Sequence, residues 1–541
     1  MAIHPRFIDD PTLPGTGNVT GVFWNHDRSI LAVASVFRLL TEPPARAAYG
    51  GHKLRHRVAL YRPPLLQPFA VFDNAAFPVN TVAFHPSRPV ALLGGGSYDG
   101  GYSFEGQLFL WDWNSSHVRD LGRVPEILFS EISADGNSAH MTVRPWDEGF
   151  AEEKGGAPFD MFFVIELPRL FERESFDDEI ALQIDRQTPK TAQDLVNVAS
   201  KPTDPAQELS TAFGITYRRR SPIWDASLID AQTIGIVHDD CLLELFGRHG
   251  GLEHSFVGEG HGVQILRGSD ATFLHVAQSP RNAWDSSKNA RTKLAKLRDA
   301  ELIDVLELDG EYTFSIAETG ALLGRCDRSL GQGDGEVDLI VTGDGQTIRK
   351  CNLGHYDVFN HFLRVDGAPR LFFVQGTPPK SHERKYLCSV DEDGKVQRLW
   401  PLLEDKGDQA SHAMECSFVY VRDRLGAGLI VSGKHYDSVP RTYCGFIYRK
   451  NLDGIEVWRH PTRSSATSIK ATRDGSIVVV AFLDGSLAVF HADTGSLVQW
   501  AEFKPGGLAT VIISLDIDET HILLGTLDGR IGVAPLTELL G

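Results

Sequence analysis

Two segments near the C-terminus repeat the same pattern of strands and turns, and this repeat constrains the fold more than any other feature. Segment 468–490 reads SIKATRDGSIVVVAFLDGSLAVF, and segment 512–534 reads IISLDIDETHILLGTLDGRIGVA. They superpose without a gap at an offset of 44 residues, with Asp484-Gly485 on Asp528-Gly529. Asp-Gly supplies the positive backbone dihedrals of a tight hairpin turn. A period of about 40–45 residues with short apolar strands predicts radially stacked, four-stranded sheets.

The same register occurs near the N-terminus. Segment 22–34 reads VFWNHDRSILAVA, and 60 residues later segment 82–94 reads VAFHPSRPVALLG. The second unit continues to a strand that ends in Trp111-Asp112. This resembles the WD-repeat family, whose blades typically end a third strand in this way. The resemblance implies a β-propeller and a role in holding other proteins.

The repeats predict an all-β chain. One four-stranded sheet cannot bury both faces, whereas sheets packed around an axis bury them against each other. We expect seven or eight blades in one domain spanning 1–541, or alternatively two fused incomplete propellers. The last unit shows three strands, and its fourth could come from the stretch around Ile3 to Ile8, which would close the ring. Candidate units lie near 18–73, 78–122, 127–170, 222–257, 262–326, 358–403, 411–460, 466–503 and 509–536.

Insertions interrupt the repeats at five places. Long loops on a rigid scaffold are common sites of function. The longest insertion includes a possible short helix around Ala192–Ala199. In 281–301, alternating basic and apolar residues suit a short basic amphipathic helix that could dock on a partner or cap the propeller. The insertions are 38–56, 144–160, 171–221, 281–301 and 327–336.

Composition narrows the functional classes. The net charge of −18 argues against a general nucleic-acid or anionic-membrane surface. No apolar run approaches the roughly 18 residues that span a bilayer. The six cysteines form no C-x-x-C pair, and the N-terminus lacks a secretion pattern, so we expect a cytoplasmic protein.

Catalytic motifs fail on inspection. Segment 428–435, GLIVSGKH, resembles a phosphate-binding loop but lacks its final Ser or Thr and fits a strand better. The glycines of 94–101 suggest a mobile loop rather than a nucleophile elbow. His249, His254 and His261 could meet at a metal, but the pattern favours separate turn or surface histidines.

These observations predict a non-enzymatic scaffold or adaptor without a cofactor, in a larger protein complex. The alternative is a propeller enzyme with a metal-dependent hydrolytic site in its central channel. Binding energy at a protein interface usually comes from a few side chains, often large aromatic residues or arginines that form two hydrogen bonds at once. The candidates in expected loops are Trp146, Arg218, Arg219, Arg220 and Trp284.

Overall fold

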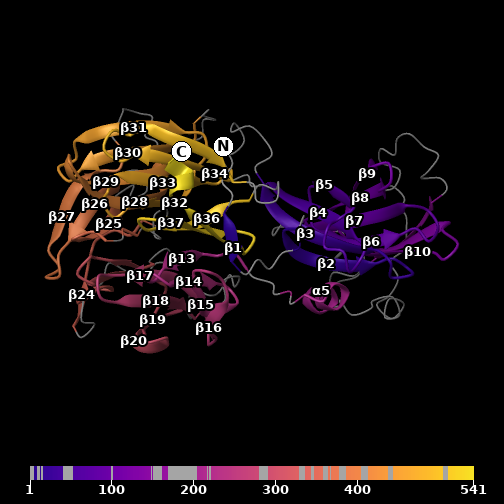
Figure 1. Cartoon of the computed structure of the whole chain (residues 1–541), viewed down its shortest axis with the longest axis horizontal. Coiled ribbons are helices and arrows are strands. Elements are labelled where there is room, and N and C mark those ends of the chain that lie inside the picture. Colours follow the sequence, from indigo (N-terminus) through magenta and orange to yellow (C-terminus); the bar gives the residue numbers. More distant parts are fainter. Residues whose placement is uncertain are drawn as a thin grey trace. The chain divides into compact units, whose positions relative to one another are not determined.

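A computed structural model provides the coordinates (Figure 1). The structure describes residues 5–540 with gaps. The gaps are 9–12, 14–15, 40–52, 99–101, 148, 150–160, 168–203, 216, 218–220, 279–289, 328–335, 343–346, 358–363, 366, 377–384, 404–411, 437–442 and 504–509.

Antiparallel sheets make up almost all of the described chain, as the sequence predicts. The described residues form ten sheets, eight with four strands and two with three. The sheets fall into two compact units. The seven-sheet unit consists of residues 1–10, 40–52 and 220–541, and the three-sheet unit of residues 11–39 and 53–219.

The three-sheet unit contains three consecutive meanders and one helix. Its first sheet is β2 (Asn18–Trp24), β3 (Leu31–Leu39), β4 (Lys53–Tyr61) and β5 (Ala70–Ala75). The second is β6 (Val79–Phe84), β7 (Val90–Tyr98), β8 (Phe104–Asp112) and β9 (His117–Pro125). The third is β10 (Ile127–Ile132), β11 (Ser138–Val143) and β12 (Met161–Glu166), and helix α5 spans Pro205–Phe213.

The first four sheets of the seven-sheet unit follow one another along the chain. They begin with β13 (Asp225–Leu228), β14 (Thr233–His238), β15 (Cys241–Gly247) and β16 (Leu252–Phe256). Next come β17 (His261–Arg267), β18 (Thr272–Ala277), β19 (Arg291–Arg298) and β20 (Glu301–Asp309). These precede β21 (Tyr312–Ile316), β22 (Leu322–Cys326), β23 (Asp338–Val341) and β24 (Ile348–Cys351), then β25 (Leu371–Gly376), β26 (Lys385–Val390) and β27 (Val396–Pro401).

Three further sheets complete this unit. The first two are β28 (His412–Asp423), β29 (Gly426–Tyr436), β30 (Gly445–Asn451) and β31 (Glu456–Thr462), then β32 (Ala466–Ala471), β33 (Ile477–Phe482), β34 (Ser486–His491) and β35 (Leu497–Glu502). The last is β36 (Ile512–Ile517), β37 (His521–Thr526), β38 (Ile531–Pro535) and β1 (Arg6–Ile8), and a short helix α6 (Thr537–Leu540) follows β38. Strand β1 pairs with β38, so Ile8 lies opposite Ile531 and the N-terminal stretch supplies the expected fourth strand.

Seven apolar clusters link the seven sheets in a cycle. Each cluster contains buried side chains from two sheets that are consecutive along the chain. The seventh joins the last sheet to the first: Ile8, Leu523 and Ile531 pack with Ile234 and Phe246. Each sheet therefore buries both faces against neighbours, which a single sheet cannot do alone.

The core of the three-sheet unit is a linear stack instead. One cluster joins its first and second sheets, and another joins its second and third. On the other face of the first sheet, Leu209 and Phe213 of α5 pack on Leu31 and Tyr61. The helix begins at the N-cap Asp204 with Pro205 at its first position and ends at Gly214 in the left-handed conformation.

Pairing registers refine the two sequence repeats. Val22 pairs with Val33 and Val82 with Leu93, so the 60-residue offset holds across both strands. Trp111-Asp112 ends β8, the third strand of its sheet, as the repeat predicts. In the C-terminal pair, Ile469 pairs with Val480 and Leu515 with Leu524. The second strands are therefore offset by 44 residues but the first strands by 46, because the later turn is two residues shorter.

Three sequence predictions are wrong. The expected helix in 281–301 is in part strand β19, whose alternating residues pair with β18 and β20 on either side. The predicted unit 262–326 holds one complete sheet and the first two strands of another. Gly94 to Tyr98 extend strand β7 rather than forming a loop, and a Cβ at Gly95 would lie 1.9 Å from the Pro78 carbonyl oxygen. By contrast, segment 428–435 lies in strand β29, as predicted.

Candidate functional site

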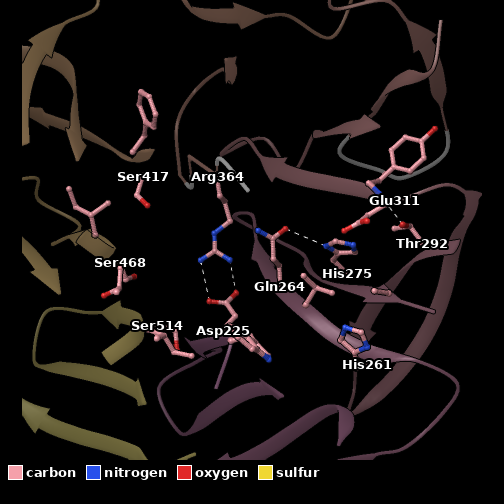
Figure 2. Close-up of a pocket in the computed structure, with 18 of the residues that line it drawn as sticks. Asp225, His261, Gln264, His275, Thr292, Glu311, Arg364, Ser417, Ser468 and Ser514 are labelled. Atoms are coloured by element: carbon pink, nitrogen blue, oxygen red, sulfur yellow. Dashed lines mark hydrogen bonds and ion pairs between the residues drawn. The ribbon is translucent and has the colours of Figure 1, made fainter. Parts of the chain in front are cut away.

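A cavity of about 580 Å³ lies within the seven-sheet unit (Figure 2). Residues of the first strands of six sheets line it, from β13, β17, β21, β28, β32 and β36. Parts of β18 and β19 and the segment before β25 complete the wall. Its volume falls in the usual range for binding sites of roughly 300–1,000 Å³.

A repeated irregularity of the first strands supplies much of the polar lining. In β17, β28, β32 and β36 the pairing register shifts by one extra residue near the start of the strand. Such a bulge redirects side chains locally. The residue after each bulge lines the cavity, and these residues are Gln264, Ser417, Ser468 and Ser514.

These four side chains differ in how they are engaged. The Ser514 hydroxyl donates to the Ile223 carbonyl at 2.9 Å, and Gln264 Oε1 lies 3.4 Å from His275 Nδ1. Within the described part of the chain, the Ser417 and Ser468 hydroxyls have no hydrogen-bonding side-chain or backbone partner. Both can therefore hydrogen-bond to a guest in the cavity.

Asp225 and Arg364 form a charged contact in the cavity wall. Arg364 donates to both carboxylate oxygens of Asp225, at 2.5 and 3.4 Å. The backbone N–H of Ile265 donates to the same carboxylate at 2.8 Å, and the Ile265 carbonyl accepts from Arg364 at 3.3 Å. The side chains are only 16% (Arg364) and 8% (Asp225) exposed, so this bidentate pair is held in place by a third, backbone partner.

Arg364 reaches the cavity because the β25–β27 sheet lacks an inner strand in the described residues. Strand β27 is largely exposed, as are the outermost strands β16 and β24 of other sheets. The strand that this sheet lacks among the described residues is therefore the innermost one. The segment before β25 lies in its place: Val365 packs in the core and Ala368 forms a parallel bridge with Ala317.

His275, one of the two histidines that line the cavity, is held neutral. Burial, with a contribution from nearby His261, lowers the pKa of His275 to about 3. Its ring also packs edge-on against Phe314, with the centroids 5.2 Å apart. An imidazole with so low a pKa is a weak proton acceptor at neutral pH, so His275 serves packing and hydrogen bonding better than general-base catalysis.

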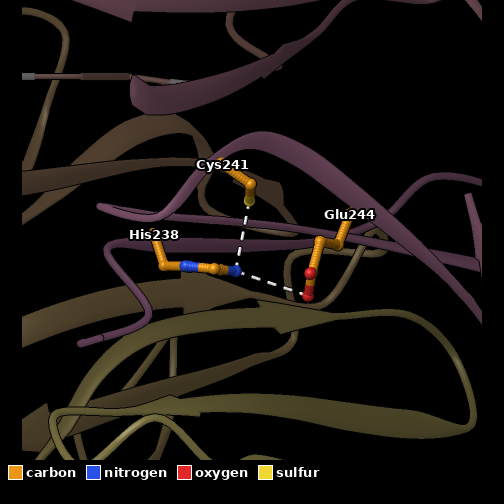
Figure 3. A group of neighbouring side chains, drawn as sticks. All are labelled: His238, Cys241 and Glu244. Carbon is orange, nitrogen blue, oxygen red and sulfur yellow. Dashed lines mark hydrogen bonds and ion pairs between the residues drawn. The ribbon is translucent and has the colours of Figure 1, made fainter. Parts of the chain in front are cut away.

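A second cluster of functional side chains lies on the β14–β15 hairpin (Figure 3). His238, Cys241 and Glu244 are buried, and their ligand-type atoms all lie within 4.8 Å of one another. His238 Nε2 is 3.1 Å from Cys241 Sγ and 3.4 Å from Glu244 Oε2. Burial by itself lowers the pKa of His238, but hydrogen bonds to Asp240, Cys241 and Glu244 outweigh it and raise the pKa to about 10.

The sequence-predicted partner residues lie elsewhere. Arg218, Arg219, Arg220 and Trp284, together with the possible helix at 192–199, fall outside the described residues. Trp146 follows β11 in the three-sheet unit, is half-buried, and accepts a backbone hydrogen bond from Phe104. Its role in partner binding stays a prediction.

The three expected metal-binding histidines are separated by the fold. His249 lies in a turn, His254 on the outer strand β16, and His261 on the inner strand β17 of the next sheet. His238 was missed by sequence reasoning. The spacing His238, Cys241 and Glu244 was a usable signal, because a tight turn brings residues three apart onto facing strands.

Comparison with known proteins gives no identification: the chain matches no family model, and no curated protein is significantly similar to it. Among the described residues, no helix has both the length and the apolar character needed to cross a bilayer.

Proposed function

We propose that the seven-sheet unit is a closed seven-bladed β-propeller. The cycle of seven apolar clusters and the β1–β38 pairing support this proposal. The expected resemblance to the WD-repeat family rests on Trp111-Asp112, which ends a third strand in the three-sheet unit and not in the proposed propeller. The three-sheet unit is then a separate stack of blade-like sheets.

We further propose that the chain is a non-enzymatic binding protein that holds a partner protein within a larger complex. The observation that carries this proposal is the cavity lined by the first strands of six sheets, with several polar side chains in its wall. Its walls are strands of packed sheets, so the polar groups are fixed before a guest arrives. Preorganisation of this kind reduces the entropy lost on binding.

The guest that fits is a polar loop or chain end of the partner. Ser417 and Ser468 line the cavity with hydroxyls that can both donate and accept a hydrogen bond. Lys470 and Arg291 also line it, and they favour a guest with acidic or carbonyl oxygen atoms.

A photo-crosslinking amino acid at position 468 tests this function. The full chain would be expressed in its native host with the crosslinker at Ser468 or, as a matched control, at exposed Ser496. We expect a partner peptide attached at 468 and not at 496, identified by mass spectrometry. Ser468→Trp, which fills the cavity, should abolish recovery of the same partner. Equal labelling at both positions, or a small metabolite attached at 468, would contradict the proposal.

A further inference from the structure

The His238, Cys241 and Glu244 cluster carries an inference that does not depend on the cavity. The three side chains converge from both strands of the β14–β15 hairpin (Figure 3). We propose that they bind one Zn²⁺, through His238 Nε2, Cys241 Sγ and Glu244 Oε2, and that the ion stabilises the seven-sheet unit.

The distances suit a tetrahedral ion. Zinc bonds to nitrogen, oxygen and sulfur ligands measure roughly 2.0–2.3 Å, so tetrahedral angles separate ligand atoms by roughly 3.3–3.6 Å. The two separations from His238 Nε2 are 3.1 Å to sulfur and 3.4 Å to oxygen. These two separations lie within about 0.5 Å of the tetrahedral values, and all three ligand atoms lie within 4.8 Å of one another.

The hairpin has a feature that this arrangement requires. Side chains alternate between the two faces of a strand, so residues 241 and 244 would ordinarily point to opposite sides. The register shifts between Ile236, which pairs with Glu244, and His238, which pairs with Cys241. The extra residue on β15 brings Cys241 and Glu244 to the same side. A bulge that re-aims a side chain in this way is typical of functional sites.

Charge balance favours a divalent cation. Glu244 is 0% exposed and His238 is 1% exposed, and a buried charge costs several kcal/mol unless it is compensated. A Zn²⁺ ion with one thiolate, one carboxylate and one neutral imidazole has no net charge.

Surrounding groups can orient the imidazole. The Asp240 backbone N–H donates to His238 Nδ1 at 3.2 Å, while Asp240 Oδ2 lies 3.6 Å and the Ser221 hydroxyl 3.4 Å from the same nitrogen. Zinc binding through Nε2 puts the proton on Nδ1, so the ring would have to turn from the backbone N–H towards the Asp240 carboxylate or the Ser221 hydroxyl. A carboxylate near the far ring nitrogen is a common partner of zinc-bound histidines, because it fixes the ring and its tautomer. The mixture of one sulfur, one nitrogen and one oxygen ligand favours Zn²⁺ over Mg²⁺ or Ca²⁺, which prefer oxygen. A water molecule would fill the fourth position.

The ion would stiffen one side of the cavity. Val237, next to His238, pairs with Asp225 and accepts a hydrogen bond from the Trp224 N–H at 3.0 Å. The Trp224 indole N–H donates to Asp239 at 2.9 Å, within the hairpin turn. Trp224 and Asp225 both line the cavity. Loss of the ion should therefore loosen the strand that carries Asp225.

Metal content and cobalt spectroscopy test the site on the untagged full chain. We expect about one Zn²⁺ per chain by elemental analysis. Metal-free protein reloaded with Co²⁺ should show a thiolate-to-cobalt charge-transfer band and visible bands of tetrahedral cobalt. Cys241→Ser should lose the charge-transfer band and the zinc, whereas Cys388→Ser, a buried cysteine in another sheet, should keep both. Asp240→Asn should weaken zinc binding by roughly 10–100-fold.

The wild-type protein decides the question even where a variant misfolds. Removing zinc with a chelator should lower the thermal midpoint, and adding Zn²⁺ should restore it. Metal-free wild type that takes up neither Zn²⁺ nor Co²⁺ would overturn the proposal. So would a cobalt complex without a thiolate band, or a Cys241→Ser variant with an unchanged spectrum.

Discussion

The seven-sheet and three-sheet units use the same kind of sheet but end their cores differently. In the larger unit the seventh cluster, containing Ile8 and Ile531, returns to the first sheet. In the smaller unit helix α5 covers the outer face of the first sheet, with Leu209 in the contact. Stacked repeats need a cap at each exposed end, whereas a cycle of sheets has no end. In the proposed propeller the repeat is completed by closure, whereas in the smaller unit α5 caps the first sheet.

The polar residues that follow the bulges of the first strands also differ between the two units. Thr81 of β6 follows a bulge, as Ser468 does, but its hydroxyl meets the Ser130 hydroxyl of the next sheet at 3.0 Å. In the larger unit, Ser417 and Ser468 follow equivalent bulges and line a cavity instead. Equivalent positions therefore join neighbouring sheets in one unit and face a binding space in the other.

Ile8→Asp should have the largest effect on stability, because it disrupts the apolar cluster that joins the last sheet to the first. Ile8 is 1% exposed, and losing its burial costs roughly 2–5 kcal/mol before the penalty of a buried carboxylate is added. Hydrogen exchange by mass spectrometry should show lost protection across β13–β38 and retained protection across β2–β12. Ile8→Val is the control, with a small effect. Equal loss of protection in both units would show that they unfold together and would break the comparison.

Asp225→Ala should come next, at about 3–5 kcal/mol, because it leaves the Arg364 guanidinium buried without its carboxylate. Chemical denaturation of Asp225→Ala, Arg364→Ala and the double variant measures this. We expect the double variant to be less destabilised than the sum of the single ones. Thr81→Val, which removes a neutral contact at the other unit, should cost only about 1 kcal/mol. Additive single effects would show that the ion pair does not act as a unit.

Local turn chemistry explains what could be predicted from the sequence. Tight-turn residues and short apolar strands identified the sheets around Val22, Val82 and Val480, because these signals involve residues close in the chain. The β21–β24 sheet was missed as a separate unit: its strands are only four or five residues long, and β24 is mostly exposed. Short, exposed strands leave little alternation to detect.

The candidate sites depended on a long-range contact and on a register shift, and strict strand alternation reveals neither. Asp225 and Arg364 are 139 positions apart, and they meet only after several sheets have packed side by side. The His238 cluster is local, but it needs the register shift on β15, which a sequence read in strict alternation would place on the wrong face. A register shift of one residue on β15 was therefore enough to conceal from sequence analysis that His238, Cys241 and Glu244 are neighbours.

Leu209→Ala should destabilise the smaller unit alone, by about 3 kcal/mol. Leu209 is 0% exposed where α5 covers the first sheet, and removing its side chain leaves a cavity there. Peptides covering β2–β4 should lose protection from hydrogen exchange, while the metal content and the β13–β38 peptides stay unchanged. Ala206→Gly, in the same helix, is a milder control at about 1 kcal/mol. A variant as stable as wild type would show that the helix is no cap.

The smallest effect should be a pH dependence that one buried histidine contributes to each unit. Burial lowers the pKa of His56 to about 4, and burial with nearby His261 lowers that of His275 to about 3. Below pH 6.5 these histidines are protonated in the unfolded chain but stay neutral in the folded chain. The free energy of unfolding therefore falls as the pH falls towards these pKa values. Each histidine contributes at most about 1.4 kcal/mol per pH unit within this window.

Substitution by glutamine separates the two contributions. His56→Gln should flatten the pH dependence of β2–β12 protection, and His275→Gln that of β13–β38 protection, between pH 6.5 and 5. Neither variant should change the slope of the other unit, because each histidine lies in a different core. A change in the pH dependence of the seven-sheet unit on His56→Gln would show that the two units share one folding equilibrium. The contrast between closure and capping would then describe their architecture but not their stability.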